Sequence, residues 1–81
     1  MAKLEPTIWI KESSMLLRAI DSTDEALLLL ANFHGDRGGM YFHAKSMLEG
    51  ARDGTVIPSD ARQAFWAFAQ DNKLLGESAA A

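Results

Sequence analysis

Residues 7–20 read TIWIKESSMLLRAI, and they contain two β-type segments around a short polar break. Residues 7–11 are largely β-branched and aromatic, which favours a pleated strand. Glu12-Ser13-Ser14 has the length of a hairpin turn, and Met15–Ile20 has the composition of a returning strand. The stretch therefore predicts an antiparallel β-hairpin, preceded by an N-terminal tail over residues 1–6.

Both faces of this hairpin are apolar. In the first strand Ile8 and Ile10 share one face, and Trp9 lies on the other. In the second strand both faces are again apolar. Leu16 and Ile20 lie on one face, and Met15 and Leu17 lie on the other. A sheet wetted on one side alternates more cleanly, and a two-stranded sheet also leaves two edges open. We therefore expect other parts of the core, or a partner, to cover the hairpin.

Three helical segments follow. Ser22-Thr23-Asp24-Glu25 is a capping box, which predicts a helix from about Thr23 to Phe33. A second helix is predicted over residues 40–53, ended by Gly54, and a third begins at Pro58. The predicted fold class is α+β, a two-stranded antiparallel hairpin followed by three helices, in one domain over residues 7–75. Residues 76–81 are predicted to be a disordered tail.

Apolar stripes predict which sides of the helices face the core. The first helix is apolar almost all round, Leu28 included, which predicts that it is the central and most buried helix. The other two stripes are Tyr41, Ala44, Leu48 and Ala51, then Ala61, Ala64, Phe65, Phe68 and Ala69.

Composition excludes several classes of protein. The chain has 81 residues, no cysteine and a formal net charge of −3. Disulfide frameworks and cysteine-ligated metals are excluded, and a nucleic-acid binder would need a concentrated basic face. The longest apolar run, residues 26–31, is too short to span a bilayer, and the N-terminal residues have no signal-peptide pattern. We expect a cytoplasmic protein with no nucleic-acid and no membrane partner.

One motif string resembles a known family. It runs Gly38-x-x-Tyr41-x-x-Ala44, then Gly54, then Pro58-Ser59-Asp60-Ala61-Arg62-Gln63-Ala64-Phe65. This resembles the domain-of-unknown-function 982 family of small bacterial proteins, roughly over residues 7–75, and Ala61-Arg62-x-x-Phe65 is its most specific element. This chain has Phe33-His34 where the family commonly has Trp-Pro, and Leu48 where it commonly has cysteine. The family has no established activity, so the resemblance implies a fold and no reaction.

Residues that could carry chemistry are few. His34 and His43 are the only histidines, and with Asp36 they make too small a set for a metal site. No catalytic, cofactor-binding or metal-ligating residue is predicted. The glycine-rich loop before the second helix suggests a weak anion site at Arg37, Gly39 and Arg62. The alternatives are a plain helix-to-helix connection and a structural ion pair of Arg62 with Asp24, Glu25 or Glu49.

The aromatic residues suggest a contact surface. Trp9, Phe42 and Trp66 project away from the apolar stripes, and large aromatics of this kind are favoured at interfaces. With Met15 and Leu17 they form a predicted partner or dimer surface, the alternative being packing within one chain. The sequence thus predicts a small non-enzymatic interaction or regulatory module that self-associates, with a weak small-molecule or anion binder as the alternative. An enzyme and a DNA binder are disfavoured.

Overall fold

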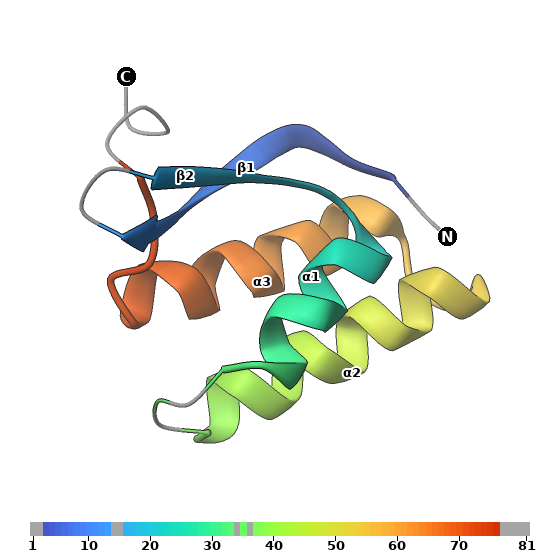
Figure 1. The fold of residues 1–81 in the computed structure, drawn as a ribbon. Coiled ribbons are helices and arrows are strands. Elements are labelled where there is room, and N and C mark those ends of the chain that lie inside the picture. The colour runs from blue at the N-terminus through green and yellow to red at the C-terminus, as the bar shows by residue number, and fades with distance from the viewer. Residues whose placement is uncertain (1–2, 14–15, 34, 36, 77–81) are drawn as a thin grey trace.

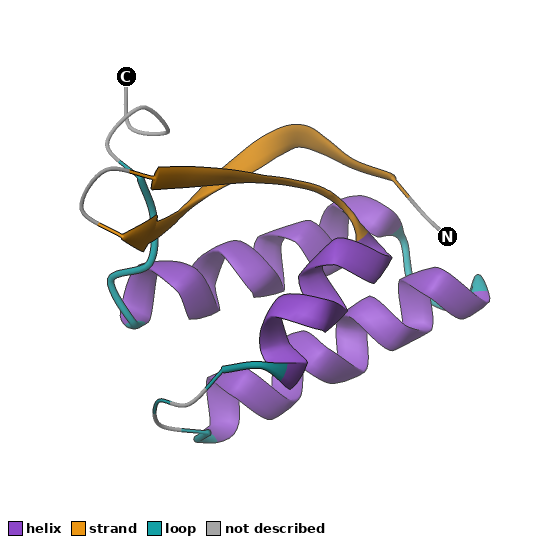
Figure 2. Ribbon diagram, viewed as in Figure 1, coloured by secondary structure: helices purple, strands orange, loops and turns teal. Residues whose placement is uncertain are grey.

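The computed structural model describes residues 3–13, 16–33, 35 and 37–76. In chain order its elements are β1 (Lys3–Ser13), β2 (Leu16–Ser22), α1 (Thr23–Ala31), α2 (Gly39–Asp53) and α3 (Pro58–Asp71). β1 and β2 form an antiparallel hairpin, and the three helices lie on one side of it, with α2 farthest from the sheet (Figures 1 and 2). The predicted α+β fold, a hairpin followed by three helices, is confirmed.

The first strand is longer than the sequence predicts. β1 begins at Lys3, which pairs with Ser22, and the Leu4 side chain is completely buried. Residues 3–6 therefore belong to the sheet and not to a tail. Proline lacks an N–H for a ladder and is tolerated in strands only at edges, strand starts or irregularities. In the structure Pro6 lies within a register shift between Lys3 and Ile8, where no ladder pair is required of it. Residues 77–81 of the predicted C-terminal tail lie outside the described part of the chain.

The register of the hairpin assigns its two faces. Ile8 pairs with Ile20, and Trp9 with Ala19. Ile8, Ile10 and Ile20 are buried against the helices, so residues of the opposite parity on β1 face away from them. The hairpin is thus covered by helices on one face only.

The start of α1 follows the predicted capping box. The Ser22 hydroxyl accepts a hydrogen bond from the Glu25 N–H at 3.2 Å, and the Glu25 carboxylate in turn accepts from the Asp21 N–H at 3.4 Å. These bonds satisfy amides that a helix start leaves without intrahelical partners. They also join the end of β2 directly to the first turn of α1.

The end of α1 differs from the prediction. The helix stops at Ala31, because Asn32 turns out of helical geometry and its side-chain amide donates to the Leu28 carbonyl at 3.0 Å. α1 has a smaller share of exposed residues than α2 or α3, as predicted, but it is not covered on every side, since Leu28 is 52% exposed. Only Thr23, Ala26 and Leu30 of this helix are fully buried. An apolar residue on every side of a helix does not require a neighbour on every side.

The core is completed by the stripes of α2 and α3. In α2 the buried residues are the predicted Tyr41, Ala44, Leu48 and Ala51. In α3 they are Ala61, Phe65, Phe68 and Ala69, while Ala64 is half-buried. Phe68 lies at the centre of an aromatic group, with ring centroids 5.1 Å from Phe33 and 5.8 Å from Tyr41.

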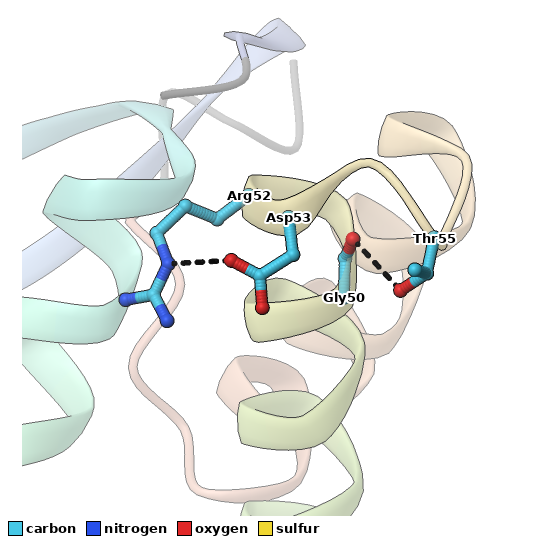
Figure 3. A network of polar contacts seen from close by, with 4 residues as sticks. All are labelled: Gly50, Arg52, Asp53 and Thr55. Carbon is cyan, nitrogen blue, oxygen red and sulfur yellow. Dashed lines mark hydrogen bonds and ion pairs between the residues drawn. The ribbon is translucent and has the colours of Figure 1, made fainter.

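A tight turn joins α2 to α3. Gly54 ends α2 in the left-handed conformation, with φ of 89°, as predicted from its position. The Thr55 hydroxyl donates to the Gly50 carbonyl at 3.2 Å, and Arg52 pairs with the adjacent Asp53 at 3.4 Å (Figure 3). The Thr55 and Val56 amides donate to the same Gly50 carbonyl. These bonds hold α2 and α3 together as an antiparallel helix pair.

Candidate functional site

The face of the hairpin away from the helices carries two exposed large apolar side chains. We call the set Trp9, Lys11, Leu17 and Ala19 the hairpin outer face. Trp9 lies beside Ala19, and Lys11 beside Leu17, in the β1–β2 register. Trp9 is 39% exposed and Leu17 is 43% exposed. Trp9 and Leu17 thus lie on a sheet face that none of the three helices covers, and Leu17 also packs against Gly76 of the segment after α3. Met15, which was predicted for the same contact surface, lies outside the described residues.

Phe42 and Trp66 do not join this face. Phe42 belongs to α2, the helix farthest from the hairpin (Figure 1), and its ring lies edge-on to Tyr41 with centroids 5.1 Å apart. Trp66 packs against the core as a half-buried residue of α3. The described residues of the predicted contact surface therefore lie in different places, and only Trp9 and Leu17 share one face.

The outer edge of β1 is not open. The Lys11 N–H donates to the Leu74 carbonyl at 2.7 Å, and the Gly76 N–H donates to the Trp9 carbonyl at 2.9 Å. The segment after α3 thus pairs with β1 like a short third strand, with a bridge between Ile10 and Leu75. We expected both edges of the hairpin to be open. This expectation is wrong for the β1 edge, because a segment distant in sequence covers that edge.

Arg62 also contacts β1. Its Nε donates to the Pro6 carbonyl at 2.6 Å, which ties α3 to β1. The sequence alternatives for Arg62 were an anion ligand and an ion pair with an acid. The observed partner is a backbone carbonyl, which periodicity within α3 could not reveal because β1 lies far away in sequence.

Arg37 has a structural position as well. Its guanidinium donates to the Phe33 carbonyl at 2.8 Å and to the Ala31 carbonyl at 3.4 Å, just past the end of α1. It also lies over the Tyr41 ring, 5.1 Å from the centroid, in a cation–π arrangement. A cation here complements the negative end of the helix dipole. Arg37 is therefore turned toward α1 and not toward an external anion.

The predicted anion site is not assembled. Gly39 begins α2, Arg37 faces the end of α1, and Arg62 is bound to Pro6 on the β1 side of the molecule. A small hollow of about 130 Å³ lies at the start of α2, and Asp71 and Asn72 of the α3 end also line it. The Asp71 carboxylate itself supplies negative charge near this helix N-terminus.

The structure also has a larger groove that sequence reasoning missed. It lies between α2 and α3, encloses about 620 Å³ and is mainly apolar. We call it the α2–α3 groove, and its principal lining residues are Met40, His43, Met47, Asp60, Ala64 and Ala67. The signal was present, because Met40, His43 and Met47 follow helical spacing on α2 while Ala64 and Ala67 leave space on α3. Recognising it required knowing that these two helix faces lie side by side.

Among the described residues, no group of three histidine, cysteine or acidic side chains could hold a metal ion. His43 instead lines the α2–α3 groove, and His34 and Asp36 lie outside the described part of the chain. None of the described helices is long and apolar enough to cross a membrane.

The comparisons with known proteins agree with the architecture. No curated protein and no solved structure matches the chain. A family model described as "Protein of unknown function (DUF982)" matches residues 7–75, which run from β1 through the segment that pairs with its edge. This match covers the hairpin, all three helices and the motif string of α2 and α3. The chain belongs to the DUF982 family.

Proposed function

We propose that the chain is a small non-enzymatic interaction module that associates with a second copy of itself through the hairpin outer face. The observation that carries the proposal is the exposure of Trp9 and Leu17, at 39% and 43%, on a sheet face without a helix. Tryptophan contributes large contact area at low entropic cost, and it is enriched among residues that dominate binding energy.

The location of the exposed apolar residues favours the hairpin outer face as the contact surface over the other two predicted aromatic positions, Phe42 and Trp66. Phe42 packs edge-on against Tyr41, and Trp66 packs on the core, so each already has an intramolecular role. Trp9 and Leu17 face away from the helices and lie on a strand pair whose β1 edge is already covered. A partner on this face would bury apolar area without breaking any existing backbone pairing.

Charge and composition restrict the class of partner and the cellular compartment that the proposal allows. The chain has a net charge of −3, with its cations distributed along the sequence, which disfavours nucleic acid and anionic membrane surfaces. It has no cysteine and needs no oxidising compartment for its fold. We therefore place the proposed self-association in the cytoplasm.

Sedimentation equilibrium over a micromolar concentration series tests the proposal. The average mass should rise with concentration, and Trp9→Ser should return the chain to a monomer. Leu28→Ala is the matched control, because Leu28 is an exposed apolar residue of α1 outside the hairpin outer face. A wild-type chain that stays monomeric throughout the series and retains no protein partner in pull-downs would overturn the proposal.

A further inference from the structure

We infer that the hairpin outer face of one copy docks into the α2–α3 groove of a second copy, so that the chains join head to tail. This inference rests on the proposed self-association and names the surface that receives Trp9. The hairpin outer face and the α2–α3 groove belong to different parts of one chain. The outer face points away from all three helices, so a chain cannot place it in its own groove.

The groove has the size and lining of a binding site. Its volume of about 620 Å³ lies within the range typical of ligand pockets. Met40 and Met47 are flexible side chains that adapt to the shape of an apolar partner. Ala64 and Ala67 have small side chains, so the α3 side of the groove has room for a large ring such as the Trp9 indole.

Charge complementarity selects the occupant. Asp60 is the one carboxylate among the described residues that line the groove. Lys11 is the charged group of the hairpin outer face, two residues from Trp9 on the same side of β1. Within the described residues, neither Lys11 nor Asp60 belongs to a recorded ion pair. Each surface thus combines exposed apolar area with one charge, and the two charges have opposite signs.

The spacing of these groups also matches. Residues two apart on a strand are separated by roughly 6.6 Å, which is the expected distance from Lys11 to Trp9 along β1. Residues four apart on a helix are separated by roughly 6 Å along its axis, which is the expected distance from Asp60 to Ala64. A Lys11–Asp60 pair between copies therefore brings Trp9 opposite Ala64, where the small side chain leaves room on α3.

A contact between two different surfaces has a definite consequence for assembly. Each chain offers one hairpin and one groove, so each contact leaves another hairpin and another groove unused. Such heterologous contacts form rings when the rotation between copies closes and open chains when it does not. Two hairpins packed against each other would instead stop at a symmetric dimer.

Mixing two variants distinguishes these arrangements. Trp9→Ala removes the anchor from the hairpin and leaves the groove intact. Ala67→Lys fills the groove with a long side chain and adds a cation that repels Lys11, while the hairpin stays intact. Circular dichroism and thermal melting confirm that both variants are folded, and sedimentation equilibrium measures their mass. We expect each variant alone to associate at least about tenfold more weakly than wild type, as loss of an interface anchor typically does.

An equimolar mixture of the two variants should form a heterodimer and stop there, because it contains one working hairpin and one working groove. The inference is overturned if the mixture stays monomeric while wild type associates, or if Ala67→Lys associates as strongly as wild type. In both cases the proposed self-association stands without this geometry. A wild-type chain that remains monomeric removes the proposed function itself.

A charge exchange gives a second measurement on less disruptive variants. Lys11→Glu and Asp60→Lys each place like charges together and should weaken association in the wild-type background. A mixture of the Lys11→Glu chain with the Asp60→Lys chain should restore both contacts between unlike chains, because each hairpin then meets a groove of opposite charge. Raised salt should weaken these contacts and the wild-type one. No gain on mixing would remove the Lys11–Asp60 pair from the proposed interface.

Discussion

The Tyr41 hydroxyl donates a buried hydrogen bond of 2.9 Å to the Leu30 carbonyl. Leu30 lies in the last turn of α1, whose final carbonyls lack partners within the helix. Asn32 and Arg37 satisfy the neighbouring carbonyls, so this helix end is held by side chains from three positions. Tyr41 thereby joins α1 to α2 and keeps a buried carbonyl paired.

Tyr41→Phe should destabilise the domain by about 1 kcal/mol, because it removes this bond and preserves the aromatic packing on Phe33 and Phe68. Urea denaturation followed by circular dichroism measures the free energy of unfolding. A change below a few tenths of a kcal/mol would mean that water or the Phe33 amide satisfies the Leu30 carbonyl equally well.

Ser22→Ala should also cost about 1 kcal/mol, because the Ser22 hydroxyl caps the first turn of α1 through the Glu25 amide. Ser59→Ala is the control, since Ser59 is an exposed residue of the first turn of α3 and its helix is capped by Ile57. Equal effects of the two substitutions in urea denaturation would argue against the capping role.

Gly50→Ala should destabilise the domain although alanine favours helices. A Cβ atom at Gly50 meets Val56, a β-branched side chain with little rotameric freedom, and overpacking of this kind costs about 1–3 kcal/mol. At Gly39 a Cβ atom meets nothing within 4 Å, so Gly39→Ala should be neutral or stabilise by a few tenths of a kcal/mol. Thermal melting of both variants checks the opposite signs.

Lys73→Gly should stabilise the domain by about 1 kcal/mol. Lys73 follows the end of α3 with φ of 58°, a conformation that is unfavourable for residues with a side chain and free for glycine. The Leu74 N–H donates to the Ala69 carbonyl at 2.8 Å and holds this geometry. Lys73→Ala provides the comparison, and it should leave the melting temperature nearly unchanged.

Arg62→Met should lower stability by about 1 kcal/mol through loss of the bond to the Pro6 carbonyl, while the methionine keeps most of the apolar stem. A thermal-shift titration with inorganic phosphate separates this role from anion binding. Phosphate should shift wild type and Arg62→Met equally, and a shift confined to wild type would restore Arg62 as an anion ligand.

Local patterns in the sequence predicted the local parts of the fold. The capping box at Ser22, the glycine at Gly54 and the proline at Pro58 each set a helix boundary through bonds within a few residues. The α2 and α3 stripes were also predictable, because helical spacing alone defines them. The early start of β1 was not, since Pro6 and Leu4 acquire their places from tertiary packing.

The candidate site depended on contacts between distant segments, and there sequence reasoning succeeded only in part. Trp9 and Leu17 share a face because strand alternation and hairpin register are local rules. Phe42 and Trp66 were grouped with them because each lies off its own stripe, and helical wheels do not say where two elements lie relative to each other. The same limit hid the α2–α3 groove and the Arg62–Pro6 bond.

The pairing of Leu74–Gly76 with β1 affects how a growing chain can fold. During synthesis β1 emerges well before Gly76, and its edge at Trp9 and Lys11 finds partners only after Gly76 has emerged. Contacts between segments so distant in sequence form slowly, and an unpaired strand edge invites pairing with other chains until it is covered. The hairpin is therefore made before the segment that covers its edge, and the nascent sheet depends on rapid synthesis of the intervening helices.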